Sequence, residues 1–269
     1  MLNNVRGYRT KEVMIKRIID EEEPVMIALV ETKLNGKIDI PGYIVSQVDR
    51  DSEGGGVLLA YKQSLKKVVV CTNEVKLNQA EMGWHMLDNG KIRLKIGVIY
   101  MPQESRTSLQ KLKEIYDVME EEVADARQKG DRILILGDLN CKIGKVIHGN
   151  KAEITKGGRL LLKLIKKYKM SVLNGERCCK GLWTRIEGEQ KSVLDYMIMF
   201  EEDVWLANKM EIDEAKDITP YYVDSGDRIY TDHCMVTAMM NIAAMEEKSL
   251  TYSMVLDDMM KAIQNIERC

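Results

Sequence analysis

The sequence predicts an α/β sandwich, and two observations carry this prediction. Short apolar runs typical of buried strands alternate along the chain with amphipathic helical patterns. The predicted strands outnumber those that one parallel layer would need, which favours a sandwich over a single doubly wound sheet. No repeat, low-complexity tract or Pro/Ser-rich linker divides the chain. We therefore expect one domain over residues 1–242 and an appended helical tail over residues 243–269.

The first half of the chain contains mainly strand patterns. A helix is predicted over residues 11–22, where apolar residues fall on one stripe and Pro24 ends the pattern. The apolar run 25–30 predicts a buried strand. Residues 54–62 and 65–73 predict two strands that pair with each other. Alternation at the start of residues 91–100 predicts a half-buried strand.

The second half begins with a long amphipathic helix, predicted over residues 108–129. An apolar strand follows at residues 132–136 and runs directly into the polar segment Gly-Asp-Leu-Asn. The remaining predicted elements are a helix at residues 158–168 and strands at residues 170–173, 192–199 and 235–240.

The composition is that of a soluble globular protein. Apolar residues make up 45% of the 269 residues and charged residues 30%, so a sizeable core can form. The net charge of −2 and the pI near 6.1 argue against a protein that coats nucleic acid indiscriminately. They leave room for an enzyme that meets phosphate with a local basic patch or a metal ion.

The cysteines and the N-terminal segment predict an intracellular protein. None of the six cysteines forms a CxxC pair, and the adjacent Cys178 and Cys179 could hardly bridge each other. No signal-peptide core and no apolar run of membrane-spanning length occurs in the sequence. We expect reduced thiols, a nuclear or cytoplasmic location rather than secretion, and no contact with a membrane.

Polar residues follow several of the predicted strands at the point where each strand ends. Glu31 follows the strand 25–30, Tyr100 ends the strand 91–100, and Asp138 and Asn140 follow the strand 132–136. In open α/β sheets, ligands bind beyond the carboxyl ends of strands. These four side chains could therefore converge although they are far apart in the sequence.

Two further groups fit a site of this kind. Asp195 is a carboxylate in an otherwise apolar strand and needs a donor, for which His233 is the natural candidate. Glu31 and Asp232 offer hard oxygen ligands, which suit Mg²⁺ or Mn²⁺ better than zinc. Asn4, at the end of the short first segment, could join them.

Each residue also has a structural interpretation when taken alone. Glu31 could be a helix cap or a surface acid, Asp138 an N-cap, and His233 a buried structural histidine. A calcium loop starting at Asp138 is excluded, because positions five, six and twelve of the loop would be Lys142, Ile143 and Gly149. The sequence contains neither a Walker loop nor a Rossmann glycine fingerprint.

Taken together and in order, the motifs resemble those of the endonuclease/exonuclease/phosphatase superfamily, which includes deoxyribonuclease I and the apurinic endonucleases. The matching segments are Asn4, Glu31-Thr32, Tyr100-Met101-Pro102, Gly137-Asp138-Leu139-Asn140, Ser192-Val193-Leu194-Asp195-Tyr196 and Thr231-Asp232-His233. The resemblance spans nearly everything from Asn4 to Met240. It implies a four-layer α/β sandwich in which helices flank two packed mixed β-sheets.

Within that superfamily the details resemble the endonuclease domain of non-LTR (LINE-like) retrotransposons. The segments that carry this resemblance are Asn-Val-Arg-Gly at 4–7, Gly-Arg-Leu-Leu at 158–161, Leu-Asn-Gly at 173–175 and Gly-Leu-Trp-Thr at 181–184. Such domains are normally followed by a reverse transcriptase, so the chain resembles part of a longer parent protein, a stand-alone gene or an element remnant.

The resemblance also implies roles for the residues. Glu31, with Asn4 and Asp232, would bind Mg²⁺, with Mn²⁺ as a substitute. Asp138 would orient or deprotonate the attacking water. His233, held by Asp195, would stabilise charge on the phosphate. Asn140 would position the phosphate or the water, and Tyr100 would donate to the phosphate or assist the leaving group.

The implied function is a monomeric, Mg²⁺-dependent DNA endonuclease that leaves a 3′-hydroxyl. Two other hypotheses stay open at this point. The same fold could act on an inositol phosphate, a lipid headgroup or RNA, or the chain could be a catalytically silent interaction protein. Two departures from the family pattern bear on these choices: Thr231 stands where the family usually has serine, and Arg6 where apurinic endonucleases often have an acid.

Overall fold

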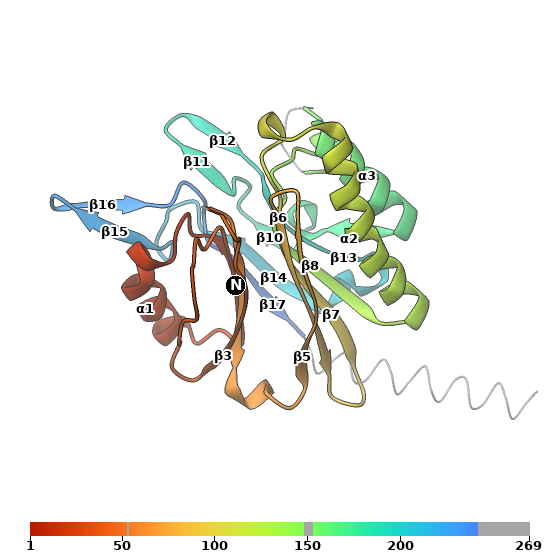
Figure 1. The fold of residues 1–269 in the computed structure, drawn as a ribbon, viewed down its shortest axis with the longest axis horizontal. Coiled ribbons are helices and arrows are strands. Elements are labelled where there is room, and N and C mark those ends of the chain that lie inside the picture. The colour runs from red at the N-terminus through yellow and green to blue at the C-terminus, as the bar shows by residue number, and fades with distance from the viewer. Residues whose placement is uncertain (53, 148–152, 242–269) are drawn as a thin grey trace, which may run out of the picture.

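The computed structural model describes residues 1–52, 54–147 and 153–241. Over these residues two large mixed β-sheets pack face to face, and helices cover both outer faces (Figure 1). The predicted four-layer α/β sandwich is therefore confirmed. The predicted tail, 243–269, lies outside the described residues.

The first sheet has seven strands with the short strand β1 at its centre. In spatial order the strands are β10 (Cys179–Lys180), β14 (Ala207–Ile212), β17 (Val236–Met240), β1 (Leu2–Asn4), β2 (Met26–Val30), β4 (Val57–Lys62) and β3 (Tyr43–Val48). β1 is parallel to β2 and antiparallel to β17. Because strands flank β1 on both sides, its three residues are fully buried.

The second sheet has six strands, and its centre is formed by β7 and β8. In spatial order the strands are β5 (Val69–Leu77), β6 (Ala80–Asp88), β7 (Arg93–Tyr100), β8 (Arg132–Asp138), β13 (Asp195–Phe200) and β9 (Met170–Val172). β7 and β8 are parallel, and their other neighbours are antiparallel. Two small hairpins, β11 (Arg185–Glu187) with β12 (Gln190–Ser192) and β15 (Tyr221–Asp224) with β16 (Asp227–Tyr230), project from the sandwich (Figure 1).

Three helices form the outer layers. α1 (Glu12–Glu22) lies on the seven-stranded sheet, while α2 (Leu109–Lys129) and α3 (Lys156–Tyr168) lie on the six-stranded sheet (Figure 1). Serine and threonine caps start α2 and α3: the Ser108 hydroxyl accepts from the Lys111 amide, and the Thr155 hydroxyl accepts from the Gly158 amide. No helix in the described ranges is long and apolar enough to cross a membrane.

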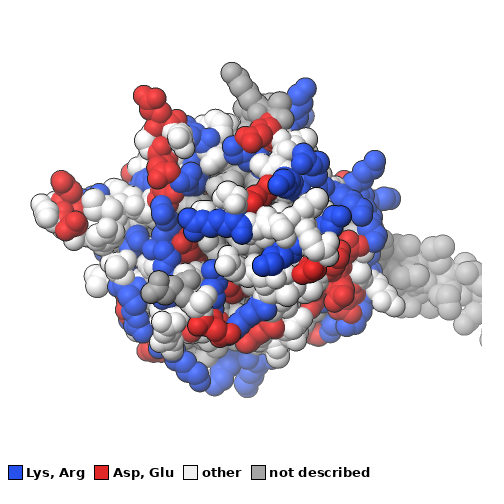
Figure 2. All heavy atoms as spheres, turned by 45° about the horizontal axis from the view of Figure 1, so that its top comes forward, with Lys and Arg blue, Asp and Glu red and all other residues white. Residues whose placement is uncertain are grey.

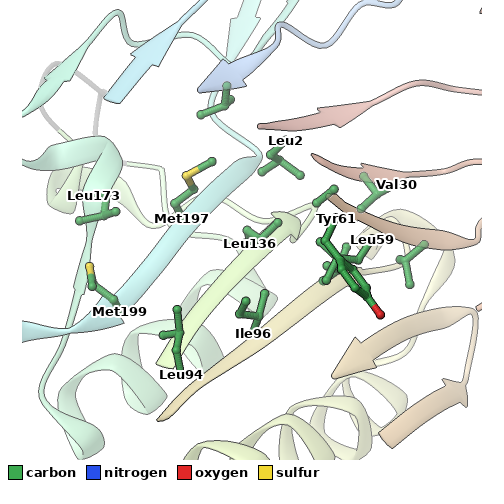
Figure 3. Close-up of a cluster of buried hydrophobic side chains, with 14 of the residues drawn as sticks. Leu2, Val30, Leu59, Tyr61, Leu94, Ile96, Leu136, Leu173, Met197 and Met199 are labelled. Carbon is green, nitrogen blue, oxygen red and sulfur yellow. The ribbon is translucent and has the colours of Figure 1, made fainter. Parts of the chain in front are cut away.

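The main core lies between the two sheets (Figure 3). Leu2 and Leu59 reach into it from the seven-stranded sheet, and Ile96, Leu136 and Met197 meet them from the six-stranded sheet. Burial of one such side chain stabilises the fold by about 1.5–3 kcal/mol. This apolar layer holds the ends of the two sheets in a defined relation to each other.

The predicted pairing of residues 54–62 with 65–73 is wrong. β4 pairs with β2 and β3 in one sheet, whereas β5 pairs with β6 in the other. A short 3-10 turn, Gln63–Leu65, starts the segment that leads the chain from one sheet to the other. Both strands contribute to the same core, from opposite sides. An apolar pattern shows which face of a strand is buried, but it does not show which strand is the hydrogen-bonding partner.

The other predicted elements match observed ones to within a few residues, with two differences. The strand predicted at 91–100 is buried on both faces in β7, because the sheet core and the helix layer cover it from opposite sides. The range 192–199 divides between the end of β12 and the strand β13. β3, β6, β14 and the two hairpins were not predicted; β6 contains polar residues and an internal glycine that obscure its pattern.

Gly137, near the end of β8, allows that strand to approach β7 closely. A Cβ atom on Gly137 would lie 1.8 Å from the carbonyl oxygen of Ile99. Since the obstacle is backbone in a central strand, no side-chain rotation can relieve the overlap. Glycine is therefore required immediately before Asp138.

We expect Gly137→Ala to lower the free energy of unfolding by about 3 kcal/mol, because β7 and β8 must separate to admit the methyl group. Equilibrium urea unfolding measures this change. Gly83→Ala, in β6 of the same sheet, is the control, because its Cβ would have no contact closer than 3.3 Å and that contact is a side chain. Equal effects of the two substitutions would refute the backbone explanation.

Candidate active site

Three of the predicted site residues form a row across the six-stranded sheet. Tyr100 ends β7 and is the register partner of Asp138, which ends β8. Asp138 is in turn the register partner of Asp195, which starts β13. Register partners project to the same face of a sheet, so the phenol and the two carboxylates lie side by side. The pairing of three strands thus assembles residues that are far apart in the sequence.

The seven-stranded sheet brings two more residues to the same place. Asn4 ends β1 beside Val30, the last residue of β2, and Glu31 follows immediately. The Asn4 side-chain nitrogen donates to Asp138 Oδ2 at 2.8 Å and so joins the ends of the two sheets. The Asn4 side-chain oxygen accepts from the Arg6 amide at 3.0 Å, which fixes the orientation of the side-chain amide.

His233 completes a buried chain of three ionisable groups. Its Nδ1 donates to Asp195 Oδ2 at 2.7 Å, and its Nε2 lies 3.8 Å from Asp138 Oδ2. The Thr184 hydroxyl accepts from the Asp195 amide at 3.0 Å and holds the start of β13 in place. The carboxylate–imidazole pair expected from the sequence is present, with His233 between Asp195 and Asp138.

The remaining predicted residue on this strand end, Asn140, holds the Asp138 carboxylate. The Asn140 amide donates to Asp138 Oδ1 at 2.9 Å, and its side-chain nitrogen lies 3.4 Å from Asp138 Oδ2 and donates to the Met101 carbonyl at 2.8 Å. Asn140 has a φ of 45°, a left-handed conformation that asparagine tolerates better than most residues. This conformation turns the chain back onto Asp138, and it explains the asparagine two residues after the aspartate.

The pKa values of Asp138 and His233 are both raised, and they differ from each other. Burial, together with the nearby charge of Asp195, raises the pKa of Asp138 to about 7. For His233, burial lowers the pKa, but the charges of Asp195 and Asp138 outweigh burial and raise it to about 9. At neutral pH the site therefore contains an imidazolium beside a carboxylate that readily exchanges a proton.

Tyr100 is a neutral phenol at all ordinary pH values. Burial raises its pKa most, and the charges of Glu31 and Asp138 raise it further. The effect of Glu31 on the pKa of Tyr100 also indicates that Glu31 lies near the phenol and belongs to the same site. The phenol can donate a hydrogen bond but cannot act as a base.

Asp232 differs from the other predicted residues in its partners. Arg6 Nη1 lies 2.9 Å from its Oδ1, and Arg185 Nε lies 2.7 Å from its Oδ2. Burial raises the pKa of Asp232, but the charges of His233 and the two arginines outweigh burial and lower it. Asp232 is thus adjacent to the site, and both of its oxygens are occupied by guanidinium groups.

Glu31 and Asn4 are suited to hold a divalent cation. Glu31 has a partly exposed carboxylate, and its ion pair is with Lys33 at 3.2 Å. The Asn4 side-chain oxygen, which also accepts from the Arg6 amide, lies at the end of the neighbouring strand. Magnesium is commonly held by one or two carboxylates, several waters and the substrate phosphate, so this sparse set is sufficient. The buried group Asp138, Asp195 and His233 could also surround a cation, but most of its ligand atoms already have partners: Asp195 Oδ2 is bonded to His233, and the two Asp138 oxygens accept from Asn4 and Asn140.

Sequence reasoning missed the contribution of Thr184 and Arg185. Thr184 ends the Gly-Leu-Trp-Thr segment and Arg185 follows it, and the sequence indicates this segment only as a family feature. Thr184 supports Asp195 through its hydroxyl, and Arg185 binds Asp232. The signal was a threonine followed by an arginine outside any predicted helix or strand, which has too many structural explanations to indicate a site without the fold.

We expect His233 to titrate near pH 9 and His85 near pH 4, because Asp195 holds the His233 imidazolium, whereas at His85 burial lowers the pKa and outweighs a backbone hydrogen bond with Gly83. NMR of the imidazole resonances against pH separates the two. Asp195→Asn should bring the pKa of His233 back toward its ordinary value of 6.5 or below it, and leave His85 unchanged. Titration of both histidines in the acid range would refute the pairing.

Solved structures with the same fold are numerous, and three illustrate their range. An apurinic endonuclease from Leishmania major has 14% identity and a TM-score of 0.68, covering 89% of this chain and 86% of the other. The endonuclease domain of TRAS1, a telomere-specific non-LTR retrotransposon, has 12% identity and a TM-score of 0.59, covering 90% and 97%. A mannosyl-6-phosphatase from Bacteroides thetaiotaomicron has 11% identity and a TM-score of 0.60, covering 89% and 98%.

At these identities the structural likeness concerns the fold. A search of curated proteins found no match. The family model described as "Endonuclease/Exonuclease/phosphatase family" matches residues 4–238, a range that contains every residue of the site from Asn4 to His233. The chain therefore belongs to the endonuclease/exonuclease/phosphatase family of phosphoester hydrolases, whose enzymes use divalent metals.

Proposed function

We propose that this protein is a Mg²⁺-dependent DNA endonuclease of the retrotransposon type, which hydrolyses a phosphodiester and leaves a 3′-hydroxyl. The observation that carries the proposal is the buried chain Asp195–His233–Asp138, tied by Asn4 to the adjacent sheet. In this chain a carboxylate whose pKa is near neutrality lies next to a positively charged imidazolium, an arrangement that suits hydrolysis of a phosphodiester.

In the proposed reaction, Asp138 takes the proton of the attacking water. Its raised pKa makes it a better base than an exposed aspartate, while it remains substantially ionised at neutral pH. Asn4 and Asn140 hold its two oxygens, so the carboxylate keeps one orientation as the water attacks. The water oxygen forms a bond to phosphorus, the bond from phosphorus to the 3′-oxygen breaks, and the departing oxygen takes a proton from solvent to become the 3′-hydroxyl.

His233 and Tyr100 act on the phosphate. The imidazolium of His233 donates to a non-bridging oxygen, where negative charge increases in the transition state. Asp195 keeps the imidazole protonated and correctly oriented through its 2.7 Å contact with Nδ1. The neutral phenol of Tyr100 donates to the phosphate or to the departing oxygen.

Glu31 and Asn4 would hold the magnesium ion, which when bound supplies positive charge to the phosphate and the leaving oxygen.

Two considerations favour DNA as the substrate. The proteins of similar structure include apurinic endonucleases and a retrotransposon endonuclease domain. Lys and Arg side chains also gather across the end of the sandwich at which the central strands β7 and β8 end (Figure 2).

We expect the purified protein to nick supercoiled plasmid with Mg²⁺ and to be inactive with EDTA. Asp138→Asn and His233→Asn should each reduce the nicking rate about 10²–10⁴-fold, because each removes a proton-transferring or charge-stabilising group. Agarose-gel assays under single-turnover conditions measure the rate.

Asp117→Asn, an exposed residue of α2, is the control and should retain full activity. Nicking by both site variants at the wild-type rate would refute the assignment. Hydrolysis of sugar phosphates, inositol phosphates or RNA without cleavage of DNA would keep the phosphoesterase and overturn the substrate.

We expect a bell-shaped dependence of kcat/KM on pH, whose two limbs have apparent pKa values of about 7 and about 9. Activity rises with pH as Asp138 loses its proton and becomes the base. It falls above about 9 as His233 loses the proton that it donates. Because the two groups interact, the limbs report the pair. Nicking rates in overlapping buffers at constant ionic strength measure the profile, and a rate that falls as pH rises from 6 to about 8 would contradict it.

A further inference from the structure

We propose that Asp232 anchors a pair of arginines, Arg6 and Arg185, that bind the phosphates of a nucleic-acid strand, and that Asp232 is not a metal ligand in this chain. The inference rests on the proposed function, because it assigns the strand-binding residues of the same site. It also changes the role that the sequence suggested for Asp232, which was to bind Mg²⁺ together with Glu31 and Asn4.

The contacts of Asp232 leave it poorly suited to a metal. Each of its two oxygens is bonded to a different guanidinium, at 2.9 Å to Arg6 and 2.7 Å to Arg185. Its side chain is only 9% exposed. A divalent cation on either oxygen would meet one of two positive charges or would have to displace it, whereas the carboxylate of Glu31 is paired with a single lysine, Lys33, whose side chain is 41% exposed.

The backbone holds both arginines against the catalytic residues. Arg6 follows β1 with a φ of 43°, and its amide donates to the Asn4 side chain. Arg185 starts β11 and pairs with His233 in an isolated bridge, while the Ile186 amide donates to the Asp232 carbonyl at 2.8 Å. The backbone of both arginines is therefore held near His233, and Asp232 orients their guanidinium groups.

The arginines have donors left for a ligand. Arg6 is 48% exposed and Arg185 25% exposed, and each guanidinium carries five N–H donors. Arg185 also contacts Glu187, whereas Arg6 contacts its partners among the described residues through Nη1 and the backbone amide. Asp232 orients both guanidinium groups and balances only one of their two charges, while the exposed Glu187 offsets part of the charge of Arg185.

Phosphate is the ligand that this arrangement recognises. The planar fork of arginine matches the paired oxygens of a phosphodiester, and a fixed guanidinium loses less side-chain entropy on binding than a free one. Two arginines in fixed positions next to the catalytic histidine suit phosphates that flank the scissile bond on one strand. Such contacts position the strand and carry no base sequence by themselves.

The first test measures binding of a fluorescein-labelled DNA duplex by anisotropy, in EDTA and over a range of salt concentrations. Arg6→Gln and Arg185→Gln should each reduce the slope of log K against log salt by about one, since each removes one phosphate contact. At a given salt concentration each should weaken binding about three- to tenfold.

Arg93→Gln is the matched control. Arg93 is 49% exposed and paired with the buried Asp131, much as Arg6 is paired with Asp232, but it starts β7 at the end of the sheet opposite Tyr100. Its loss should leave the salt slope unchanged. Asp232→Asn should also reduce the slope although it removes a negative charge, because the guanidinium groups lose their anchor.

The second test measures Mn²⁺ binding by electron paramagnetic resonance in the absence of DNA. Glu31→Gln should weaken Mn²⁺ binding more than about tenfold, while Asp232→Asn should stay within about twofold of the unmodified protein. Circular dichroism confirms that each variant is folded before it is compared. These readouts require no turnover.

Three results would overturn the inference. One is loss of Mn²⁺ binding in Asp232→Asn as large as in Glu31→Gln. Another is an equal salt slope in Arg6→Gln, Arg185→Gln and Arg93→Gln. The third is competition by millimolar inorganic phosphate as effective as by unlabelled DNA, which would indicate a small phosphomonoester site. Absence of nicking with the expected slopes intact would refute the proposed reaction and leave the arginine assignment standing.

Discussion

The site depends on the burial of one carboxylate, that of Asp138, which is only 1% exposed. A buried charge is costly unless it is paired and hydrogen-bonded, and the surrounding structure supplies those partners. Asn4 donates from the other sheet, Asn140 donates from the following turn, and the imidazole of His233 lies 3.8 Å away. Three residues from distant parts of the sequence therefore contact or lie near one carboxylate.

The sandwich architecture provides this convergence. Asp138 reaches its position because β8 lies between β7 and β13, and Asn4 reaches it because β1 lies at the centre of the opposite sheet. The apolar layer between the sheets maintains their separation, so that a 2.8 Å hydrogen bond can join their ends. A shift of one residue in any of these registers would turn its polar side chain to the opposite face.

Two groups of charged residues lie next to each other, one buried and one partly exposed to solvent. The chain Asp195–His233–Asp138 is buried, and the charges of its members shift one another's pKa values. Such shifted pKa values suit proton transfer. Asp232, the residue next to His233, lies between two arginines that are partly open to solvent. Neighbouring residues in the sequence thus serve the chemistry and, in our proposal, the binding of the strand.

The sequence by itself determined the class of fold and the identity of the main chemical groups. Apolar strands that end in Glu31, Tyr100 and Asp138 could be read from residue order, because alternation and strand-end polarity are local properties. Only the tertiary structure decided which sheet each strand enters, as β4 and β5 demonstrate. It also decided the partners of Asp232, since Arg6 lies 226 residues away in the chain and no local pattern encodes a contact over that distance.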